Sequence, residues 1–206
     1  MFDDRYDVAQ QLAERLLKYH LKNPLVLAIP RGAVPMARVI ADKIDGELDV
    51  VLVRKLRAPH YPELAIGSVD ESGWTYLADY AEAYGVDADY IAAETRSQMK
   101  TLRERRARYT PDRVPISPMG RVVIVVDDGL ATGATMIAAL HGLRAGKPAR
   151  VICAVPVAPL DTLKKISNLA DEVICLHAPA SFQSVGQFYH HFPQIEDNEV
   201  IKILRG

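Results

Sequence analysis

Two adjacent carboxylates and the short turn that follows them are the groups in this sequence best suited to chemistry. The carboxylates belong to Asp127 and Asp128. The turn consists of Ala131, Thr132, Gly133, Ala134 and Thr135. Its threonine hydroxyls can donate hydrogen bonds, its glycine lets the backbone approach a ligand closely, and the start of a helix adds unpaired N–H groups with a partial positive charge. Together these groups suit a phosphate or a carboxylate.

The two aspartates cannot bind the same anion as the turn, because like charges repel. They suit hydroxyl groups, or a cation, next to that anion. Ribose 5-phosphate, with a phosphate at one end and a diol beside it, would satisfy both the turn and the aspartates. The alternative interpretation is an ordinary strand-to-helix turn that Asp and Thr residues cap.

A strand and a helix must hold these groups in place. Residues 122–126 are five β-branched apolar residues in a row, which is typical of a strand covered on both faces in a parallel sheet. An Ala-rich stretch predicts a helix from the turn through Leu143. Because ligands of open α/β sheets bind at the carboxyl ends of the strands, the aspartates lie where a site is expected.

The apolar run, the acidic pair and the Ala-Thr-Gly-Ala-Thr turn resemble the phosphoribosyl pyrophosphate signature of the type I phosphoribosyltransferases. In that family the acidic pair holds the ribose 2- and 3-hydroxyls, and the turn holds the 5-phosphate. The resemblance implies these roles for Asp127 and Asp128 and for residues 131–135. It also implies Mg²⁺ as the cofactor, held mainly by the substrate, with Asp127 or Asp128 as the candidate protein ligand.

A second strand, loop and helix predict another anion site. Residues 25–29 predict a short buried strand, and a helix is expected from about residue 34 to residue 43. Between them lie Pro30, Arg31, Gly32 and Ala33. A guanidinium beside helix N–H groups favours an anion. In the family that the sequence resembles, this loop binds the pyrophosphate group, which implies the same role here. Taken alone, the loop would be better explained as a helix start with a solvent-facing Arg31; its position relative to residues 127–135 favours the functional interpretation.

A Pro-rich segment after the next predicted strand, residues 49–53, is strongly cationic. It holds Arg54, Lys55, Arg57 and His60 within seven positions. We interpret this segment as a mobile lid, because the family has a flexible loop at the corresponding place that closes over the pyrophosphate and excludes water. Lys55 and Arg57 are then the candidate catalytic groups that neutralise charge. Solvated charges on an ordinary surface loop are the alternative.

Residues 64–69 and 74–77 predict a β-hairpin, and a long charged helix is expected from about residue 87 to residue 109. The basic residues of this helix are Arg96, Lys100, Arg103, Arg105, Arg106 and Arg108. We expect a solvated face or a homodimer contact, since the chain has no net basic charge and no aromatic platform lies among these residues. The alternative function is a non-catalytic regulator that senses phosphoribosyl pyrophosphate and binds RNA through this face.

The C-terminal segment from Phe182 to Phe192 is dense in aromatic residues. Purine-type members of the family have a C-terminal hood in which a Val-Gly pair and aromatic residues stack on the nucleobase. The resemblance implies that Phe182, Val185 and Phe188 bind the acceptor. A packed aromatic cluster that seals the C-terminus is the alternative. The 6-oxopurine enzymes carry an Asp at the position of Ala131, so its absence counts against hypoxanthine and guanine as acceptors.

Composition limits the class of protein. The chain has 206 residues with 25 basic and 26 acidic side chains, which allows one well-buried domain plus an appendage. A net charge of -1 gives no electrostatic reason to expect nucleic acid or an anionic membrane as a partner. The apolar runs are only strand-length and the N-terminus is charged, so we expect a cytoplasmic protein without a membrane span. Cys153 and Cys175 lie in strand-like runs and are expected to be buried free thiols.

These observations predict an α/β fold with a mostly parallel central sheet and helices on both faces. Residues 1–206 would form a single phosphoribosyltransferase-like domain, with a small hood contributed by about residues 84–118 and 178–206. By resemblance, the protein is an enzyme of nucleotide metabolism that transfers ribose 5-phosphate from Mg-phosphoribosyl pyrophosphate to a small-molecule nitrogen acceptor, a nucleobase or related heterocycle, and releases pyrophosphate. A homodimer is expected.

Overall fold

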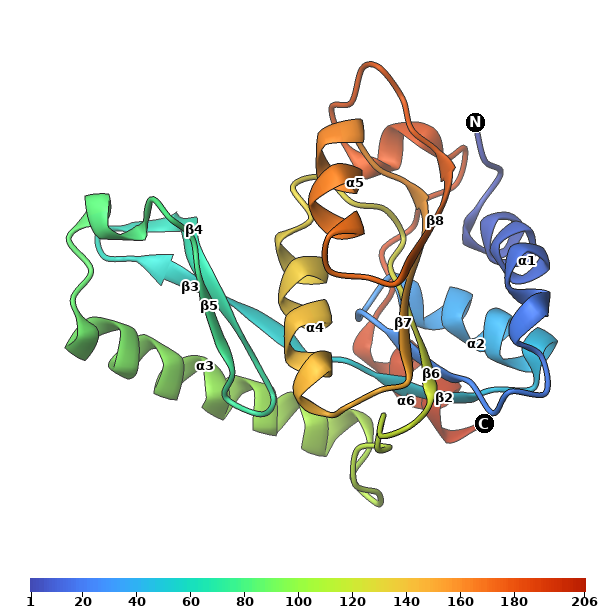
Figure 1. Cartoon of the computed structure of the whole chain (residues 1–206), viewed down its shortest axis with the longest axis horizontal. Helices are drawn as coiled ribbons and strands as arrows, with labels where there is room; N and C mark the ends of the chain where they lie inside the picture. The colour runs from blue at the N-terminus through green and yellow to red at the C-terminus, as the bar shows by residue number, and fades with distance from the viewer.

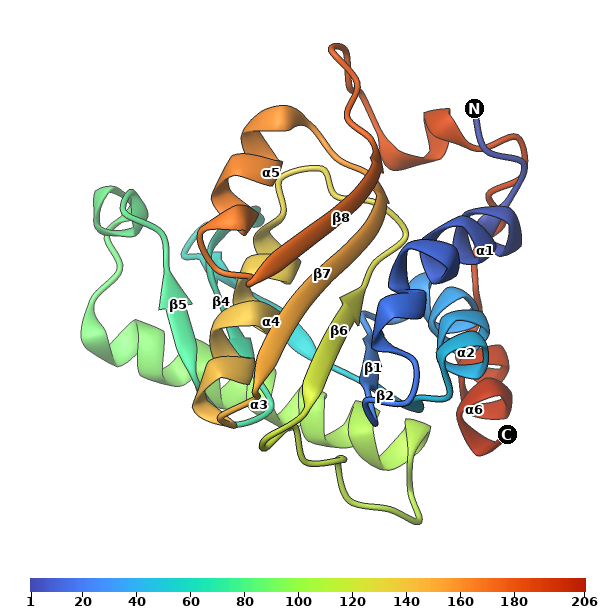
Figure 2. The ribbon, with the colours of Figure 1, turned by 45° about the vertical axis from the view of Figure 1, so that its right-hand side comes forward.

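In the computed structural model, which describes the backbone of residues 1–206 and every side chain except that of Pro62, five parallel strands form a central sheet. Their order is β2-β1-β6-β7-β8, and Figure 2 shows them side by side. The strands are β1 (Leu25–Ala28), β2 (Glu47–Val50), β6 (Val122–Val126), β7 (Arg150–Val157) and β8 (Glu172–His177). The predicted mostly parallel sheet is confirmed.

Helices cover both faces of this sheet, with α1, α2 and α6 on one face and α4 and α5 on the other (Figure 1). The helices are α1 (Arg5–Leu16), α2 (Ala33–Ile44), α4 (Ala134–Ala145), α5 (Leu160–Ser167) and α6 (Asp197–Arg205). Successive residues of a strand belong to two separate hydrophobic clusters. Val26 packs in the cluster that contains α1 and α2, whereas Leu25 and Leu27 pack in the cluster that contains α4. Burial on both faces explains why the strands show no alternation.

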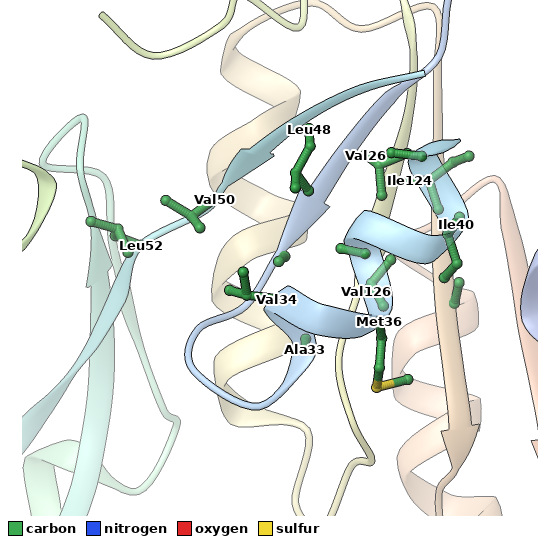
Figure 3. Packing of buried hydrophobic residues seen from close by; sticks show 14 of the residues in the cluster. Val26, Ala33, Val34, Met36, Ile40, Leu48, Val50, Leu52, Ile124 and Val126 are labelled. Atoms are coloured by element: carbon green, nitrogen blue, oxygen red, sulfur yellow. The ribbon is translucent and has the colours of Figure 1, made fainter. Parts of the chain in front are cut away.

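The cluster that contains α1 and α2 includes the last residues of β1 and β6, Ala28 and Val126, next to the loops that follow these strands. Figure 3 shows Val26, Ile124 and Val126 of the sheet beside Met36 of α2. All four side chains are fully buried. Because Ala28 of β1 is in register with Val126 of β6, the carboxyl ends of these two strands lie side by side, and so do the loops after them.

A second, antiparallel sheet lies beyond α4 (Figure 1). Its strands are β3 (Val53–Ala58), β4 (Tyr61–Asp70) and β5 (Thr75–Leu77), and α3 (Ala88–Tyr109) packs against it. β4 and β5 form the predicted hairpin. Lys55 and Arg57 lie in β3, so this segment is not the unpatterned loop that we expected. They pair with Ser68 and Ala65 of β4, and such cross-strand pairing is not visible in a Pro-rich, charged sequence. The mobility of the segment stays a prediction.

Stacked rings and one close backbone approach dock the antiparallel sheet onto α4. The His141 ring stacks with Trp74 at 4.9 Å between centroids and with Tyr76 at 5.9 Å. The next residue of α4, Gly142, lies directly against Asp70 at the end of β4. A Cβ on Gly142 would lie 1.7 Å from Asp70 Oδ2, so no larger residue fits there. The sheet therefore has a defined position against α4.

A buried ion-pair network joins β2, the turn after β4 and α3. Arg106 donates to Asp49 Oδ1 at 2.8 Å and to the two carboxylate oxygens of Glu71 at 2.7 and 2.6 Å. Asp49 is 1% exposed and also accepts a hydrogen bond from Arg113 at 3.3 Å. Arg106, which the RNA alternative assigned to an open basic face, is therefore engaged inside the protein.

The C-terminal segment returns past the N-terminus and ends in α6. A backbone bridge pairs Phe2 with Tyr189. α6 packs against α2, and at the end of α3 the Tyr109 hydroxyl donates to Asp197 at 2.7 Å. The two segments expected to build the hood meet at this contact, while most of α3 packs on the antiparallel sheet.

Three short 3-10 helices complete the fold: η1 (Leu17–Tyr19), η2 (Ala81–Tyr84) and η3 (Val185–Phe188). Both cysteines are free as predicted, with Cys153 buried and Cys175 only partly buried. Within the part of the chain that the structure describes, no helix is both long and apolar enough to span a bilayer.

Candidate functional site

The acidic pair lies at the carboxyl ends of two neighbouring central strands. Asp127 and Asp128 follow β6 directly, and Pro30 lies just beyond β1. These three residues and Thr135 line a cavity of about 460 Å³, which we call the acidic-pair cavity. The antiparallel sheet contributes Val53, Arg54, Lys55, Arg57, Glu63 and Ala65 to its lining. Carboxylates, the start of α4 and cationic side chains therefore surround one space.

A smaller cavity of about 160 Å³, the loop cavity, adjoins the acidic-pair cavity along residues 129–136. Asp127 and Lys55 line both cavities. Asp127 therefore lies where the two cavities meet, next to the turn, as a single ligand that contacts both would require.

The turn at residues 131–135 is held in shape by α5. Gly133 has a φ of 75°, a left-handed conformation that favours glycine, and it caps the N-terminus of α4. The Thr162 hydroxyl donates to the Ala131 carbonyl at 2.7 Å. A Cβ on Gly133 would lie 2.7 Å from Thr162 Cγ2, so the turn packs tightly on this residue. Because α4 begins at Ala134, the turn presents the unpaired N–H groups of a helix start, which suit an anion.

Two side chains that are distant in sequence hold Asp128. Arg5 of α1 donates to Asp128 Oδ2 from Nη2 at 2.8 Å and from Nε at 3.1 Å. The Tyr189 hydroxyl donates to the Asp128 carbonyl at 2.7 Å. Arg5 is itself fixed, since its guanidinium lies 3.8 Å from the centroid of the Phe192 ring and donates to the Pro193 carbonyl at 2.7 Å. The orientation of Asp128 is thus set by the N- and C-terminal segments.

The two carboxylates of the pair are in different electrostatic environments. Burial, and then the negative charge of Asp128, raise the pKa of Asp127 well above its ordinary value. Burial also raises the pKa of Asp128, but the hydrogen bonds and positive charge of Arg5 oppose this effect. Asp127 accepts a hydrogen bond from the Asp128 backbone N–H but has no cation paired with it as Asp128 has, and a bound cation or hydroxyl donor would add compensation.

The loop at residues 30–33 lies directly against the acidic pair. Pro30 lines the acidic-pair cavity, and the Pro30–Arg31 peptide bond is cis. A Cβ on Gly32 would lie 1.8 Å from Asp128 Oδ2, so no larger residue fits beside this carboxylate. Ala33 is buried at the start of α2.

The side chain of Arg31 points away from the acidic-pair cavity. Its Nη1 lies 3.6 Å from Glu196 and 3.9 Å from Asp197, both in the C-terminal segment. Arg31 lines a separate cavity of about 340 Å³, together with Arg5 and Asp128. Its contact with pyrophosphate stays a prediction.

Lys55 and Arg57 both reach the acidic-pair cavity from β3. Both side chains are exposed, and both line this cavity although the pairing with β4 shifts register between Leu56 and Arg57. Lys55 lies nearer to the turn, because it also lines the loop cavity. A strand, and not a loop, positions the two cations that we named as catalytic candidates.

The three acceptor-binding candidates in the C-terminal segment pack among themselves and their neighbours. The Phe188 ring lies 5.4 Å from the Phe182 ring and 5.6 Å from the His177 ring, centroid to centroid. Val185 fills the space beside Gly129, where a Cβ would lie 2.5 Å from Val185 Cγ1. Among the described side chains around the acidic-pair cavity, none comes from these three residues. The contacts favour the packed aromatic cluster, and the nucleobase role stays a prediction.

Arg5, Thr162 and Tyr189 support the site. The sequence did not single out Arg5 or Thr162, and it indicated Tyr189 only as one residue of the aromatic C-terminal segment. Arg5 lies 123 positions from Asp128, and Tyr189 lies 61 positions away. No local pattern connects such residues. Arg5 carries no sequence signal of its own, because its burial and its partner are visible only in the folded chain.

Comparisons with known proteins find a matching family and several similar chains. A family model described as the phosphoribosyl transferase domain matches residues 3–192. A Mycobacterium tuberculosis protein named "Putative phosphoribosyl transferase" is 42% identical over 207 residues, which cover 99% of this chain and 46% of that protein. The chain thus spans about half the length of the curated relatives that it matches most fully.

Two solved structures extend the comparison. The crystal structure of the protein TT1426 from Thermus thermophilus has a TM-score of 0.87 at 43% identity, and the match covers 99% of this chain and 97% of that one. A purine phosphoribosyltransferase from Pyrococcus horikoshii has a TM-score of 0.51 at 15% identity, over 93% of this chain and 92% of that one, which is a likeness of fold alone.

Proposed function

Because this chain belongs to the phosphoribosyl transferase family, we propose that it is an enzyme that transfers ribose 5-phosphate from phosphoribosyl pyrophosphate to a nitrogen acceptor and releases pyrophosphate. The observation that best supports this proposal is the shared lining of two adjoining cavities, which brings together the acidic pair, the turn at residues 131–135 and Lys55. These groups match the ribose hydroxyls, the 5-phosphate and the pyrophosphate, respectively.

The proposed reaction needs positioning and charge stabilisation more than a protein nucleophile. Displacement of pyrophosphate from the anomeric carbon builds positive charge on the sugar and negative charge on the leaving group. Asp127 and Asp128 would bind the ribose hydroxyls, and Arg5 would keep Asp128 in the required orientation. The backbone N–H groups of the turn would hold the 5-phosphate. Lys55 and Arg57 would stabilise the charge that develops on pyrophosphate.

The acidic pair fits Mg²⁺ as a partial protein ligand. Carboxylate oxygens are the hard donors that Mg²⁺ prefers, and the raised pKa of Asp127, caused by burial and by the charge of Asp128, indicates uncompensated negative charge. Among the described residues, no group of three or more His, Cys, Asp or Glu side chains could hold a metal, so substrate oxygens would complete the coordination. Bound Mg²⁺ would supply charge neutralisation for the pyrophosphate.

The acceptor in this proposal is a nucleobase or a related nitrogen heterocycle. Position 131 carries alanine, and its carbonyl accepts a hydrogen bond from Thr162. The turn therefore offers no carboxylate to assist a ring nitrogen, and this favours acceptors other than hypoxanthine and guanine.

A screen of nucleobases and related heterocycles for pyrophosphate release, with phosphoribosyl pyrophosphate and Mg²⁺, tests the proposal. Calorimetry tests its binding half: Asp128→Asn should lower the affinity for Mg-phosphoribosyl pyrophosphate at least tenfold, which is about 1.4 kcal/mol. Asp112→Asn, an exposed carboxylate in the connector before β6, is the matched control and should bind like the wild type. Equal affinity of all three proteins would refute the assignment.

A further inference from the structure

A fourth cavity lies between the antiparallel sheet and α4, next to the turn at residues 131–135. Its volume is about 690 Å³, within the range that holds a small organic ligand. We call it the sheet–helix cavity. It shares Lys55, Thr132 and Ala134 with the loop cavity, and Ile137 of α4 and Lys165 of α5 also line it. The two cavities are therefore neighbours with a common edge.

Strand register explains which side chains face this cavity. Lys55 of β3 is paired with Ser68 of β4, and Ser68 is paired with Tyr76 of β5. Side chains directly opposite one another across antiparallel strands project from the same face of a sheet. This face looks toward α4, because the Tyr76 ring stacks with His141. A cation, a hydroxyl and an aromatic ring thus form one row along the cavity wall.

Ser68 is the polar group in this row that lacks a partner. Its side chain is buried, with the residue 2% exposed, and its hydroxyl finds no hydrogen-bond partner among the described residues. A buried hydroxyl is unfavourable unless it makes a hydrogen bond. Ser68 lines the sheet–helix cavity, but its hydroxyl is covered; a rotation about χ1 would turn the hydroxyl toward a ligand there, which would supply the missing bond.

We propose that the sheet–helix cavity binds a nucleoside monophosphate, at a site separate from that of the transfer reaction. The Tyr76 and Tyr80 side chains offer aromatic surface to a planar ring, and the Ser68 hydroxyl would bond the polar edge of that ring. Lys165 of α5, which lines neither the acidic-pair cavity nor the loop cavity, supplies positive charge for the phosphate.

Two carboxylates complete the chemistry of the cavity. Glu63 and Asp79 also line it, and both are exposed. They suit the hydroxyl groups of a ribose, as hydrogen-bond acceptors, and they disfavour a ligand that is anionic along its whole length. A ring, a ribose and a single terminal phosphate therefore fit this lining better than a polyphosphate does.

The tryptophan fluorescence of the full chain tests this site directly, because Trp74 is the one tryptophan in the sequence and stacks with His141 next to Tyr76. We would titrate AMP, GMP, CMP and UMP separately into the wild type and into Ser68→Ala. At least one nucleotide should change the Trp74 signal in a saturable way, and Ser68→Ala should bind that nucleotide about tenfold more weakly.

Thr95→Val is the matched control. The Thr95 hydroxyl of α3 is also buried without a partner among the described residues, and Thr95 is not part of the lining of the sheet–helix cavity. Both variants should fold, since each loses only an unpartnered hydroxyl. Thr95→Val should bind the nucleotide like the wild type. Lys165→Gln should weaken binding of the nucleotide but not of the corresponding nucleoside, which lacks the phosphate.

A second arm separates this site from the acidic-pair cavity, where a nucleotide could bind as a reaction product. The titration is repeated with saturating Mg-phosphoribosyl pyrophosphate, and we expect affinity for the nucleotide to change less than threefold. Displacement of the nucleotide by phosphoribosyl pyrophosphate, equal binding by Ser68→Ala, or no response to any of the four nucleotides at millimolar concentration would each overturn the proposal. If the proposed transfer reaction were wrong, the separate screen would show no pyrophosphate release. The nucleotide titration without phosphoribosyl pyrophosphate would still test the sheet–helix cavity.

Discussion

The two neighbouring aspartates of the site differ in their electrostatic environment, because only Asp128 forms an ion pair with Arg5. Arg5 compensates the charge of Asp128, whereas burial and the nearby charge of Asp128 raise the pKa of Asp127 well above its ordinary value. When Asp127 is charged, its burial next to Asp128 therefore destabilises the folded protein. Perturbed carboxyl groups of this kind are typical of binding and catalytic sites.

Asp127→Asn should therefore stabilise the protein while it impairs ligand binding. Burial and the charge of Asp128 oppose ionisation of Asp127, so removal of this ionisable group should raise the free energy of unfolding at pH 7. The amide oxygen can still accept the backbone hydrogen bond that Asp128 N donates to Asp127 Oδ1 at 2.9 Å. Urea unfolding of the wild type and the variant measures the difference.

The difference in free energy of unfolding between the wild type and Asp127→Asn should depend on pH, which tests whether burial of the Asp127 charge is its cause. An acid whose pKa is raised in the folded state binds its proton more tightly there, so the wild type loses stability as pH rises from the unfolded pKa of about 3.9 through the folded value. The advantage of Asp127→Asn should grow over that interval and should vanish below it. Asp112→Asn, which changes an exposed carboxylate, should show no such growth. A constant advantage at every pH would argue against burial of charge as its origin.

At the level of single residues, the sequence predicted the groups that lie on loops but not those that support them. The acidic pair and residues 131–135 follow one strand in a recognisable order, and the neighbouring loop at 30–33 follows another. Arg5 and Tyr189 come from opposite ends of the chain, and only the folded backbone brings them to Asp128. Arg31 shows the reverse case, because its place in the loop was predictable but its side-chain direction, toward Glu196, was not.

The proposed phosphate site depends on the turn at residues 131–135, on α4, which begins in this turn, and on α5, which packs against it. Gly133 combines a left-handed conformation with close packing on Thr162. These two demands can be separated, because Gly85 has a similar φ of 70° but open space where a Cβ would lie.

Gly133→Ala should cost about 1 kcal/mol for the left-handed backbone and roughly 1–3 kcal/mol more for the overlap with Thr162 Cγ2. Gly85→Ala should show the first cost alone. Adding Thr162→Ser to Gly133→Ala removes the overlapping methyl but keeps a hydroxyl that can bond the Ala131 carbonyl, so much of the second cost should be recovered. Thermal unfolding of the four proteins checks this. Equal losses in Gly133→Ala and Gly85→Ala would show that packing on α5 does not constrain the turn.

At the level of elements, continuous apolar runs were reliable signals and short charged strands were not. Residues 122–126 were predicted as a strand, and β6 has the same bounds; residues 25–29 were predicted as another, and β1 spans Leu25–Ala28. β3 was missed, since Lys55 and Arg57 alternate with only one fully buried leucine, Leu56, and the pairing that makes the strand comes from β4. Long-range pairing of this kind outweighs local propensity.

In the whole molecule, the antiparallel sheet brings Lys55 to the site, and its position depends on charge as well as on packing. The network around Arg106 connects α3 to Asp49 of the central sheet and to Glu71 after β4. Of the six basic residues on that helix, the sequence did not show that Arg106 would be buried, because burial depends on partners from two other elements.

Arg106→Met should therefore destabilise the protein strongly, by roughly 3–5 kcal/mol, because it leaves the buried Asp49 carboxylate and Glu71 without their main counter-charge. Arg103→Met removes an exposed charge from the same helix and should stay within about 0.5 kcal/mol of the wild type. Because Trp74 docks the antiparallel sheet on α4, loosening of the sheet should also shift Trp74 emission to the red at denaturant concentrations below the main transition. A loss of stability in a single transition, with unchanged Trp74 emission in the native state, would show that the Arg106 network stabilises the whole fold. That result would exclude a separate role of the network in placing Lys55.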